Sequence, residues 1–230
     1  MTISTLRLHA ERLRQTALRV RNDASGIAAT EFALILPVML TLYLGCAEIT
    51  KGVMASRKVN LAARAMSDLV AQQASGVPLD NTTLTNVFNA SKSILSPYST
   101  TALKMTISGV QAQSKSDGTC CTAKVKWTVV HNGGTPRSCT GALTQVSNTT
   151  APAPTNIPQD LVAPTATTTA RPFIVVADVK YTYEPGFGHA LMQWNVGAIL
   201  NMGSTSYMPP RVASTLSLST TTPTGATVCP

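Results

Sequence analysis

One uninterrupted apolar run dominates the sequence and limits what the chain can fold into. From Ile27 to Ala47 there are 21 residues with a single charged side chain, Glu31. As an α-helix this run is about 31 Å long, close to the thickness of the hydrocarbon layer of a membrane. The apolar core of a secretory signal peptide is shorter, about 7 to 15 residues. The sequence therefore predicts a transmembrane helix over residues 27–47.

A basic segment precedes this run and indicates its orientation. Five arginines lie before Gly26: Arg7, Arg12, Arg14, Arg19 and Arg21. The stretch "TLRLHAERLRQTALRVR" also has Leu6, Leu13 and Val20 at heptad spacing, which predicts a short amphipathic helix on an anionic cytoplasmic leaflet. The positive-inside rule places residues 1–26 in the cytoplasm. Basic residues also follow the run, so this rule alone does not fix the orientation. The candidate disulfide cysteines lie on the carboxyl side of the run, and because disulfides form in the oxidising periplasm, they favour a cytoplasmic amino end.

Glu31 has two interpretations. In the first, it is an interfacial glutamate about 7 to 8 Å deep whose carboxylate reaches back to water, which membrane helices tolerate. In the second, the chain is cut after Gly26, and the new amino group on Ile27, with a pKa of about 8, is mostly cationic. Glu31 would then neutralise an Ile27 amine of its own or of a neighbouring chain. A glycine at the cut lets a protease approach the backbone closely.

The segment "GIAATEFALILP" resembles the processing segment of the TadE-like pseudopilins of tight-adherence (Flp) pili, which are related to type IV pilins. The resemblance is strong from Asn22 to Lys51 and weak over "VVADVKYTYEPGFG". It implies that a membrane prepilin peptidase cleaves between Gly26 and Ile27, with Glu31 and Phe32 at positions five and six of the mature chain.

The same resemblance implies a pseudopilin or minor pilin needed for pilus assembly. The expected location is the bacterial inner membrane, with a single pass, a cytoplasmic amino end and a periplasmic carboxyl-terminal domain, and possible incorporation into a surface pilus. The expected partners are the prepilin peptidase, the major Flp pilin, other minor pilins, the inner-membrane assembly platform and membrane lipid.

Helical periodicity continues beyond the membrane segment. Pro37, in the middle of the run, removes one backbone hydrogen bond and is a candidate helix kink. Residues 48–75 read as a periplasmic extension of the same helix, which ends before Gly76 and Pro78. Its apolar residues recur at multiples of four, with charges on other faces: Ile49, Val53, Leu61, Ala65 and Leu69.

The remaining residues, 76–230, predict a periplasmic α+β domain. Residues 83–95 read as a short helix, and alternating apolar residues predict strands near 103–107, 125–129 and 173–183. The Thr-, Pro- and Ala-rich segment 144–172 reads as a long exposed loop with at most a short turn at "PQDLV", and the tail after Pro209 as loose. The expected fold is a long amino-terminal helix, half of it transmembrane, with a small antiparallel sheet domain stapled by disulfides.

Four cysteines are candidates for those disulfides: Cys120, Cys121, Cys139 and Cys229. Adjacent cysteines rarely pair with each other, so two pairings are expected: 120 with 139 and 121 with 229, or 120 with 229 and 121 with 139. Metal binding is the rival explanation, but no CxxC spacing or nearby histidine favours it, and no metal or cofactor is expected. Cys46 lies in the apolar run and is treated as a small apolar residue.

Other classes of protein fit the sequence less well. The net charge is +8, but outside the leader the basic residues are scattered, so nucleic acid is not an expected partner. The three histidines are far apart and no catalytic motif is present, so no enzyme is predicted. The alternatives are an unprocessed periplasmic binding domain held by a signal anchor, and a lipoprotein acylated at Cys46, which "YLGCAE" fits poorly.

Overall fold

The computed structural model describes residues 25–113, 122–147, 149–162, 172–186, 199–219 and 223–229. The predicted leader helix, Cys120 and Cys121 lie outside these residues. The chain divides into two compact units, residues 1–49 and 50–230.

The described part of the first unit belongs to helix α2, which spans Ser25–Ala71 and continues through Pro37. Among the described residues, α2 is the one helix that is long and apolar enough to cross a membrane. Its residues from Gly26 to Leu42 are exposed along all sides. An apolar helix without a packed face is typical of a membrane span. A kink at Pro37 stays a prediction.

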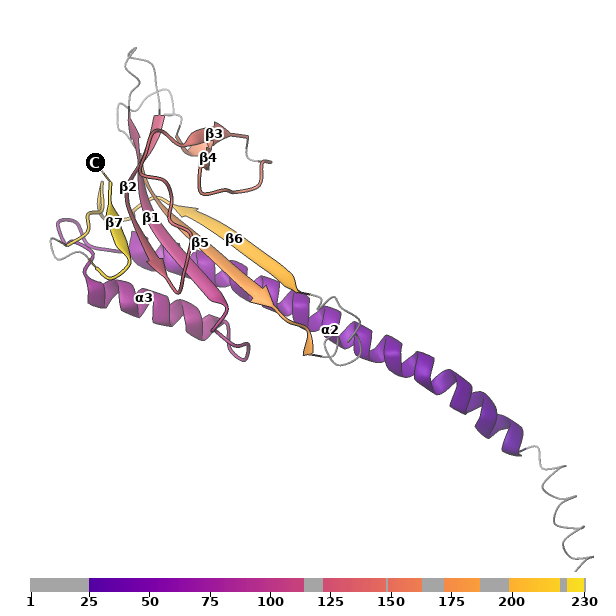
Figure 1. Cartoon of the computed structure of the whole chain (residues 1–230). Helices are drawn as coiled ribbons and strands as arrows, with labels where there is room; N and C mark the ends of the chain where they lie inside the picture. The colour runs from indigo at the N-terminus through magenta and orange to yellow at the C-terminus, as the bar shows by residue number, and fades with distance from the viewer. Residues whose placement is uncertain are drawn as a thin grey trace, which may run out of the picture. The chain divides into compact units, whose positions relative to one another are not determined.

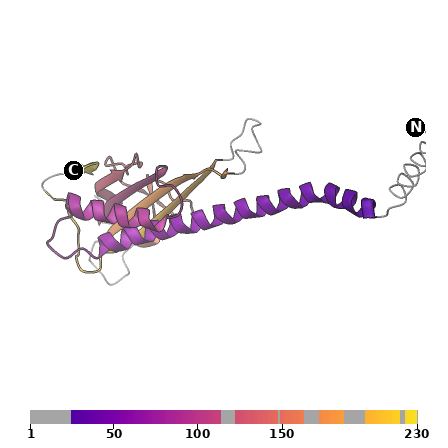
Figure 2. The same ribbon diagram turned by 90° about the horizontal axis from the view of Figure 1, so that it is seen from below.

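The second unit is an α+β domain built on a five-stranded antiparallel sheet with strand order β6-β5-β1-β2-β7. The strands are β1 (Leu103–Gln113), β2 (Thr122–His131), β5 (Phe173–Tyr183), β6 (Leu200–Met208) and β7 (Ala226–Val228). The carboxyl-terminal part of α2 and helix α3 (Asn81–Ile94) cover one face of the sheet (Figure 1). Figure 2 shows both helices on the same side of the strands. The α+β prediction is confirmed.

Helix α3 begins where a polar cap favours it. Asp80 is its N-cap, and its carboxylate accepts a hydrogen bond of 2.8 Å from the backbone N–H of Thr83. The hydrogen bonds from Thr83 hold the pKa of Asp80 below its usual value. The helix then buries Leu84, Val87 and Phe88 against the sheet. The predicted helix over 83–95 is thus present with slightly different ends.

The main core lies between the helices and the inner face of the sheet. Strand β1 contributes Leu103, Met105 and Ile107 to this core, whereas Val110 faces a second, outer cluster. The register of β1 and β2 shifts at Gly109 and Val110, and Lys126 is the extra residue on β2. A Cβ on Gly109 would lie 2.4 Å from the Trp127 ring, so glycine is required where this large side chain crosses the strand.

The segment 144–172 was predicted as an exposed loop, and this prediction is wrong for its described part. Strands β3 (Thr144–Val146) and β4 (Asn156–Pro158) form a small parallel sheet, followed by the 3-10 helix η1 (Gln159–Leu161) at the predicted turn. Ile157 and Val162 are fully buried in the outer cluster. The segment therefore covers part of the outer face of the main sheet.

The prediction of a loose tail after Pro209 is also wrong for the described residues. The backbone N–H of Leu79 donates to the Ser217 carbonyl at 2.9 Å, and the Ser219 N–H donates to the Leu79 carbonyl at 2.9 Å. Leu216 is buried in the main core, and β7 pairs with β2 at the edge of the sheet. Hydrogen bonds and burial thus fix much of this tail to the domain.

The side of α2 that packs in the second unit is not the predicted apolar row. The residues buried against the domain include Ala55, Val59, Ala62, Met66 and Val70. Of the predicted row, Ile49, Val53, Leu61 and Leu69 are exposed. The helix therefore has apolar residues on two sides, and the domain covers one of them.

Candidate functional site

The predicted cleavage site lies in the first turn of α2. The helix begins at Ser25, so the peptide bond between Gly26 and Ile27 is part of that turn. A Cβ placed on Gly26 would meet no atom within 4 Å. The fold itself therefore does not require glycine here.

Glu31 lies one helical turn after Ile27. Residues four apart share one face of a helix, and side chains tilt toward the amino end, so the Glu31 carboxylate leans toward Ile27. Within the described residues no ion pair involves Glu31. Phe32, the next residue, is 64% exposed on a neighbouring face. The arrangement places one carboxylate close to the point where cleavage would create an amine.

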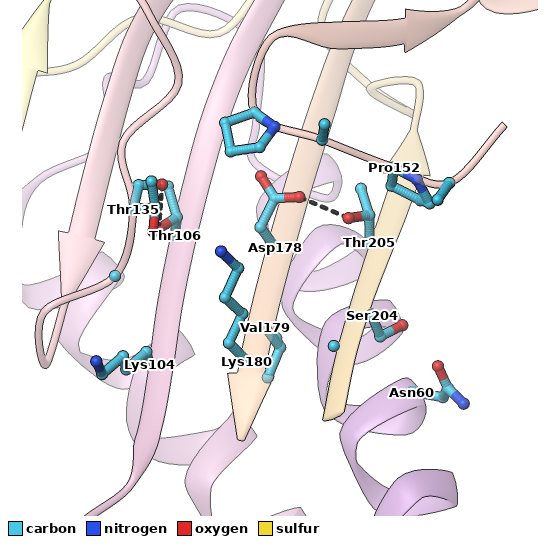
Figure 3. Close-up of a pocket in the computed structure, with 15 residues that line it drawn as sticks. Asn60, Lys104, Thr106, Thr135, Pro152, Asp178, Val179, Lys180, Ser204 and Thr205 are labelled. Carbon is cyan, nitrogen blue, oxygen red and sulfur yellow. Dashed lines mark hydrogen bonds between the residues drawn. The ribbon is translucent and has the colours of Figure 1, made fainter. Parts of the chain in front are cut away.

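A second candidate site is a cavity of about 540 Å³ on the outer face of the main sheet (Figure 3). Its walls come from β1, β5 and β6, from residues 134–135 and 151–154, and from Asn60 of α2. Lys104 and Lys180 both line it and lie opposite each other in the register of β1 and β5. Like charges opposite each other across strands destabilise a sheet, and a bound anion would offset this.

Asp178, which lines this cavity, forms an ion pair with Arg137. The Arg137 guanidinium donates from Nε to Asp178 Oδ2 and from Nη2 to Asp178 Oδ1, both at 2.8 Å. The Thr205 hydroxyl also donates to Asp178 Oδ1, at 2.6 Å, as Figure 3 shows. Arg137 is 1% exposed, and its Nη1 donates to the carbonyls of Ala153 and Asn156. The pair therefore attaches the segment around β4 to strand β5.

His131 ends β2, and the next two residues, Asn132 and Gly133, have positive φ values of 52° and 70°. Its ring stacks on Phe88 with a centroid distance of 4.8 Å. Burial, and then the nearby positive charge of Lys92, lower the pKa of His131. The side chain is thus a packed part of the domain. Within the described residues no group of three or more potential metal ligands occurs.

The cysteines pair differently from the prediction. Cys139 forms a disulfide with Cys229, with a Cα–Cα distance of 5.1 Å, and neither expected pairing contains this bond. The bond is possible because β7 pairs with β2 and brings the end of the chain beside the segment after β2. Cys46 is exposed on α2 and is not part of a disulfide.

The sequence analysis missed the residues around the cavity: Lys104, Arg137, Asp178, Lys180 and Thr205. One signal was present, because Asp178 is an acidic residue inside an otherwise apolar stretch of strand, and such a carboxylate needs a partner. Arg137, 41 residues earlier in the chain, cannot be identified as that partner from spacing.

The model of the family described as TadE-like protein matches residues 26–67 of the chain. The match begins at the predicted cleavage site and covers most of α2. No curated protein and no solved structure matches the chain. The resemblance that the sequence predicted is confirmed over this segment. Over residues 26–67 the chain is similar to the TadE-like family.

Proposed function

We propose that this chain is a pseudopilin or minor pilin that takes part in assembling a tight-adherence pilus. In this proposal a prepilin peptidase removes residues 1–26, and the mature chain begins at Ile27. The proposal depends on one observation, the position of Gly26, Ile27 and Glu31 at the entry of a membrane-length helix inside the TadE-like segment. The location and partners expected from the resemblance belong to the same proposal.

Three parts of the chain would contribute to assembly. The Glu31 carboxylate would neutralise an Ile27 amine, the apolar residues of α2 would pack against neighbouring helices, and the domain after residue 50 would contact other pilus proteins. No catalysis is proposed, because none of these roles needs a reaction of this chain. A charged amine in an apolar assembly is costly unless a carboxylate compensates it, which supports the role of Glu31.

The experiment that tests the proposal is the intact mass and amino-terminal sequence of the protein purified from membranes of its native host. A chain that starts at Ile27 is the expected result. The variant Gly26→Val should keep its leader, because the side chain obstructs the peptidase. Gly45→Val is the matched control, since a Cβ at Gly45 also meets no atom within 4 Å. A wild-type chain that starts near Met1 would overturn the proposal.

A second candidate function is a membrane-tethered domain that binds an anionic ligand and keeps its leader. The cavity with the opposed Lys104 and Lys180 favours it. The same mass measurement separates the candidates, because this protein would start near Met1. A lipoprotein would start at an acylated Cys46.

A further inference from the structure

The part of α2 in the second unit has an exposed apolar face with no function in the fold. This face follows the row Val53, Arg57, Leu61, Ala65 and Leu69. Each step of four residues turns about 40° around the helix, so the first three residues lie opposite the buried side and the last two approach it. Val53 is 48% exposed, Leu61 54% and Leu69 39%. On the opposite side of the helix, Ala55, Val59 and Met66 are at most 1% exposed. Water-exposed leucines in a continuous row on a helix indicate a surface that packs against a partner.

A second row, in the membrane-length part of α2, has the same pattern with the opposite charge. It consists of Ile27, Glu31, Ile35, Met39 and Tyr43, again spaced by four. Each row has five residues, and in each the second residue carries the only charge. Adding 26 to each residue number of this row gives the row that begins at Val53.

We propose that these two rows pack against each other between neighbouring copies of this chain. One copy lies parallel to the next, shifted by 26 residues, or about 39 Å at 1.5 Å per residue, and the rows meet where Glu31 and Ile35 of one copy face Arg57 and Leu61 of the other. Glu31 of one copy then lies beside Arg57 of the other, and Ile35 lies beside Leu61. The parallel direction follows because all copies enter the membrane with the same end. This inference rests on the proposed function and specifies the packing within the assembly.

Charge complementarity explains why one carboxylate is placed in the apolar row. A guanidinium binds a carboxylate with two parallel hydrogen bonds, and such charged bonds are stronger away from water. A carboxylate can accept about four hydrogen bonds, so Glu31 can bind Arg57 of a neighbour and an Ile27 amine at the same time. A shift of 33 residues would instead bring Glu31 to Arg64, the other arginine of α2.

Arg64 is the alternative partner, and its row fits poorly. This arginine is also exposed, but its row is Asn60, Arg64, Asp68 and Gln72. Bringing Glu31 to Arg64 would place Ile27 against Asn60 and Ile35 against Asp68. Asp68 moreover forms an ion pair with Arg211 within its own domain. A shift that buries two polar groups against isoleucines is unfavourable.

Cysteine crosslinking in the native host tests the packing. Two differently tagged full-length copies, both carrying Cys46→Ser, are produced together, one with Ile35→Cys and the other with Leu61→Cys. Mild oxidation should give a mixed disulfide between the two tagged chains. The control pairs Ile35→Cys with Asn60→Cys, which is exposed but lies about 100° around the helix from Leu61. Equal crosslinking at Asn60 would overturn the proposed register. If Leu61→Cys instead forms a disulfide with a protein of different mass, the proposal that a second copy of this chain covers the exposed row is wrong.

Charge exchange gives an independent test. Arg57→Glu should lower the yield of the 35–61 crosslink about tenfold or more, because it places two carboxylates together. Combining Arg57→Glu with Glu31→Arg should restore most of the yield, whereas Arg64→Glu should leave it near the wild-type value. Equal losses for Arg57→Glu and Arg64→Glu, with no rescue by the double variant, would overturn the pairing.

The amino-terminal sequence separates a failure of this inference from a failure of the proposed function. Processed chains that form pili but give no 35–61 crosslink would overturn the packing alone. Chains that keep their leader but give the crosslink would overturn the pilin proposal and leave the contact between copies established.

Discussion

At the scale of single residues, Arg137 holds the outer layer of the domain in place. Its guanidinium binds Asp178 through two hydrogen bonds and also binds the carbonyls of Ala153 and Asn156. Because the Arg137 side chain is excluded from water, removing it leaves Asp178 without its counter-charge. Replacing both residues of a buried ion pair with apolar residues changes the stability of a protein little. Removing only one of them lowers stability strongly, because it leaves the other charge buried without a partner.

The variant Arg137→Ala should therefore lower the free energy of unfolding by about 3–5 kcal/mol. The measurement is urea unfolding of the full chain in a non-ionic detergent, followed by near-ultraviolet circular dichroism. Arg64→Ala is the control, and as an exposed arginine it should change the free energy by less than about 0.5 kcal/mol. An Arg137→Ala variant as stable as this control would show that water replaces the guanidinium.

His131 makes stability depend on pH. Its pKa in the folded state is lowered by burial, then by Lys92, so the fold favours the neutral ring. Below the unfolded value of about 6.5, the unfolded chain binds a proton more readily than the folded one. The contribution of His131 to stability is therefore complete above about pH 6.5, and it falls as the pH decreases toward the folded pKa.

The test is the free energy of unfolding of the wild type and of His131→Phe across this pH range. Phenylalanine keeps the stacking on Phe88 but cannot titrate. The difference between the two proteins should grow as the pH falls below about 6.5. Comparing them removes the contributions of carboxylates and of the other two histidines. Parallel pH curves would mean that the folded state protonates His131 without cost.

At the scale of elements, the disulfide secures the last strand. Cys139 and Cys229 are 90 residues apart, and β7, next to Cys229, pairs with β2 over only three residues. Such a short edge strand gives few hydrogen bonds, so the covalent link stabilises this part of the sheet. By the chain-entropy estimate, closing a loop of this length contributes about 4 to 5 kcal/mol.

Replacing both cysteines, as Cys139→Ala with Cys229→Ala, should lower the free energy of unfolding by about 2–5 kcal/mol. Changing both leaves no unpaired thiol to exchange with Cys120 or Cys121. Hydrogen exchange measured by mass spectrometry should show the largest loss of protection in β7. Cys46→Ala is the control and should leave this protection unchanged. Unaltered exchange in β7 would show that its packing alone is sufficient.

Helices and strands with a regular local pattern could be predicted from the sequence, whereas elements that depend on distant residues could not. The helices α2 and α3 and the strands β1, β2 and β5 were predicted because their apolar residues recur with a regular local period. Strand β6 was missed because "LNMGSTSYM" is an edge strand with small polar residues and no such period. Strand β7 and the covered segment around β4 depend on pairing with distant residues, which no local pattern reveals.

The candidate sites also differ in whether a local sequence pattern predicts them. Gly26, Ile27, Glu31 and Phe32 form a local motif, so the sequence predicts them together. The ion pair of Arg137 with Asp178 joins residues 41 apart and depends on the sheet. The apolar row around Leu61 was visible in the sequence, but only the structure shows that the domain leaves it exposed.

At the scale of the whole molecule, α2 combines a membrane-length apolar segment with a folded domain that leaves a further apolar row uncovered. A membrane tether needs only the first of these features. An assembly subunit needs both, because its helix must leave lipid and pack against other helices. In the proposed function the charge on Glu31 acts in assembly, whereas insertion does not depend on it, since a carboxylate near the membrane surface costs little.

The variant Glu31→Ala should therefore be inserted and cleaved like the wild type, with Ile27 as its first residue, but form about tenfold fewer pili. Glu31→Gln, which keeps the size and removes the charge, should show the same loss. Glu48→Gln, near the end of the apolar segment, is the matched control for removing a charge from α2. Pili are counted by electron microscopy, and the amino terminus is sequenced in parallel. Normal pilus numbers in Glu31→Gln would mean that the carboxylate only reaches water at the membrane surface and has no role in assembly.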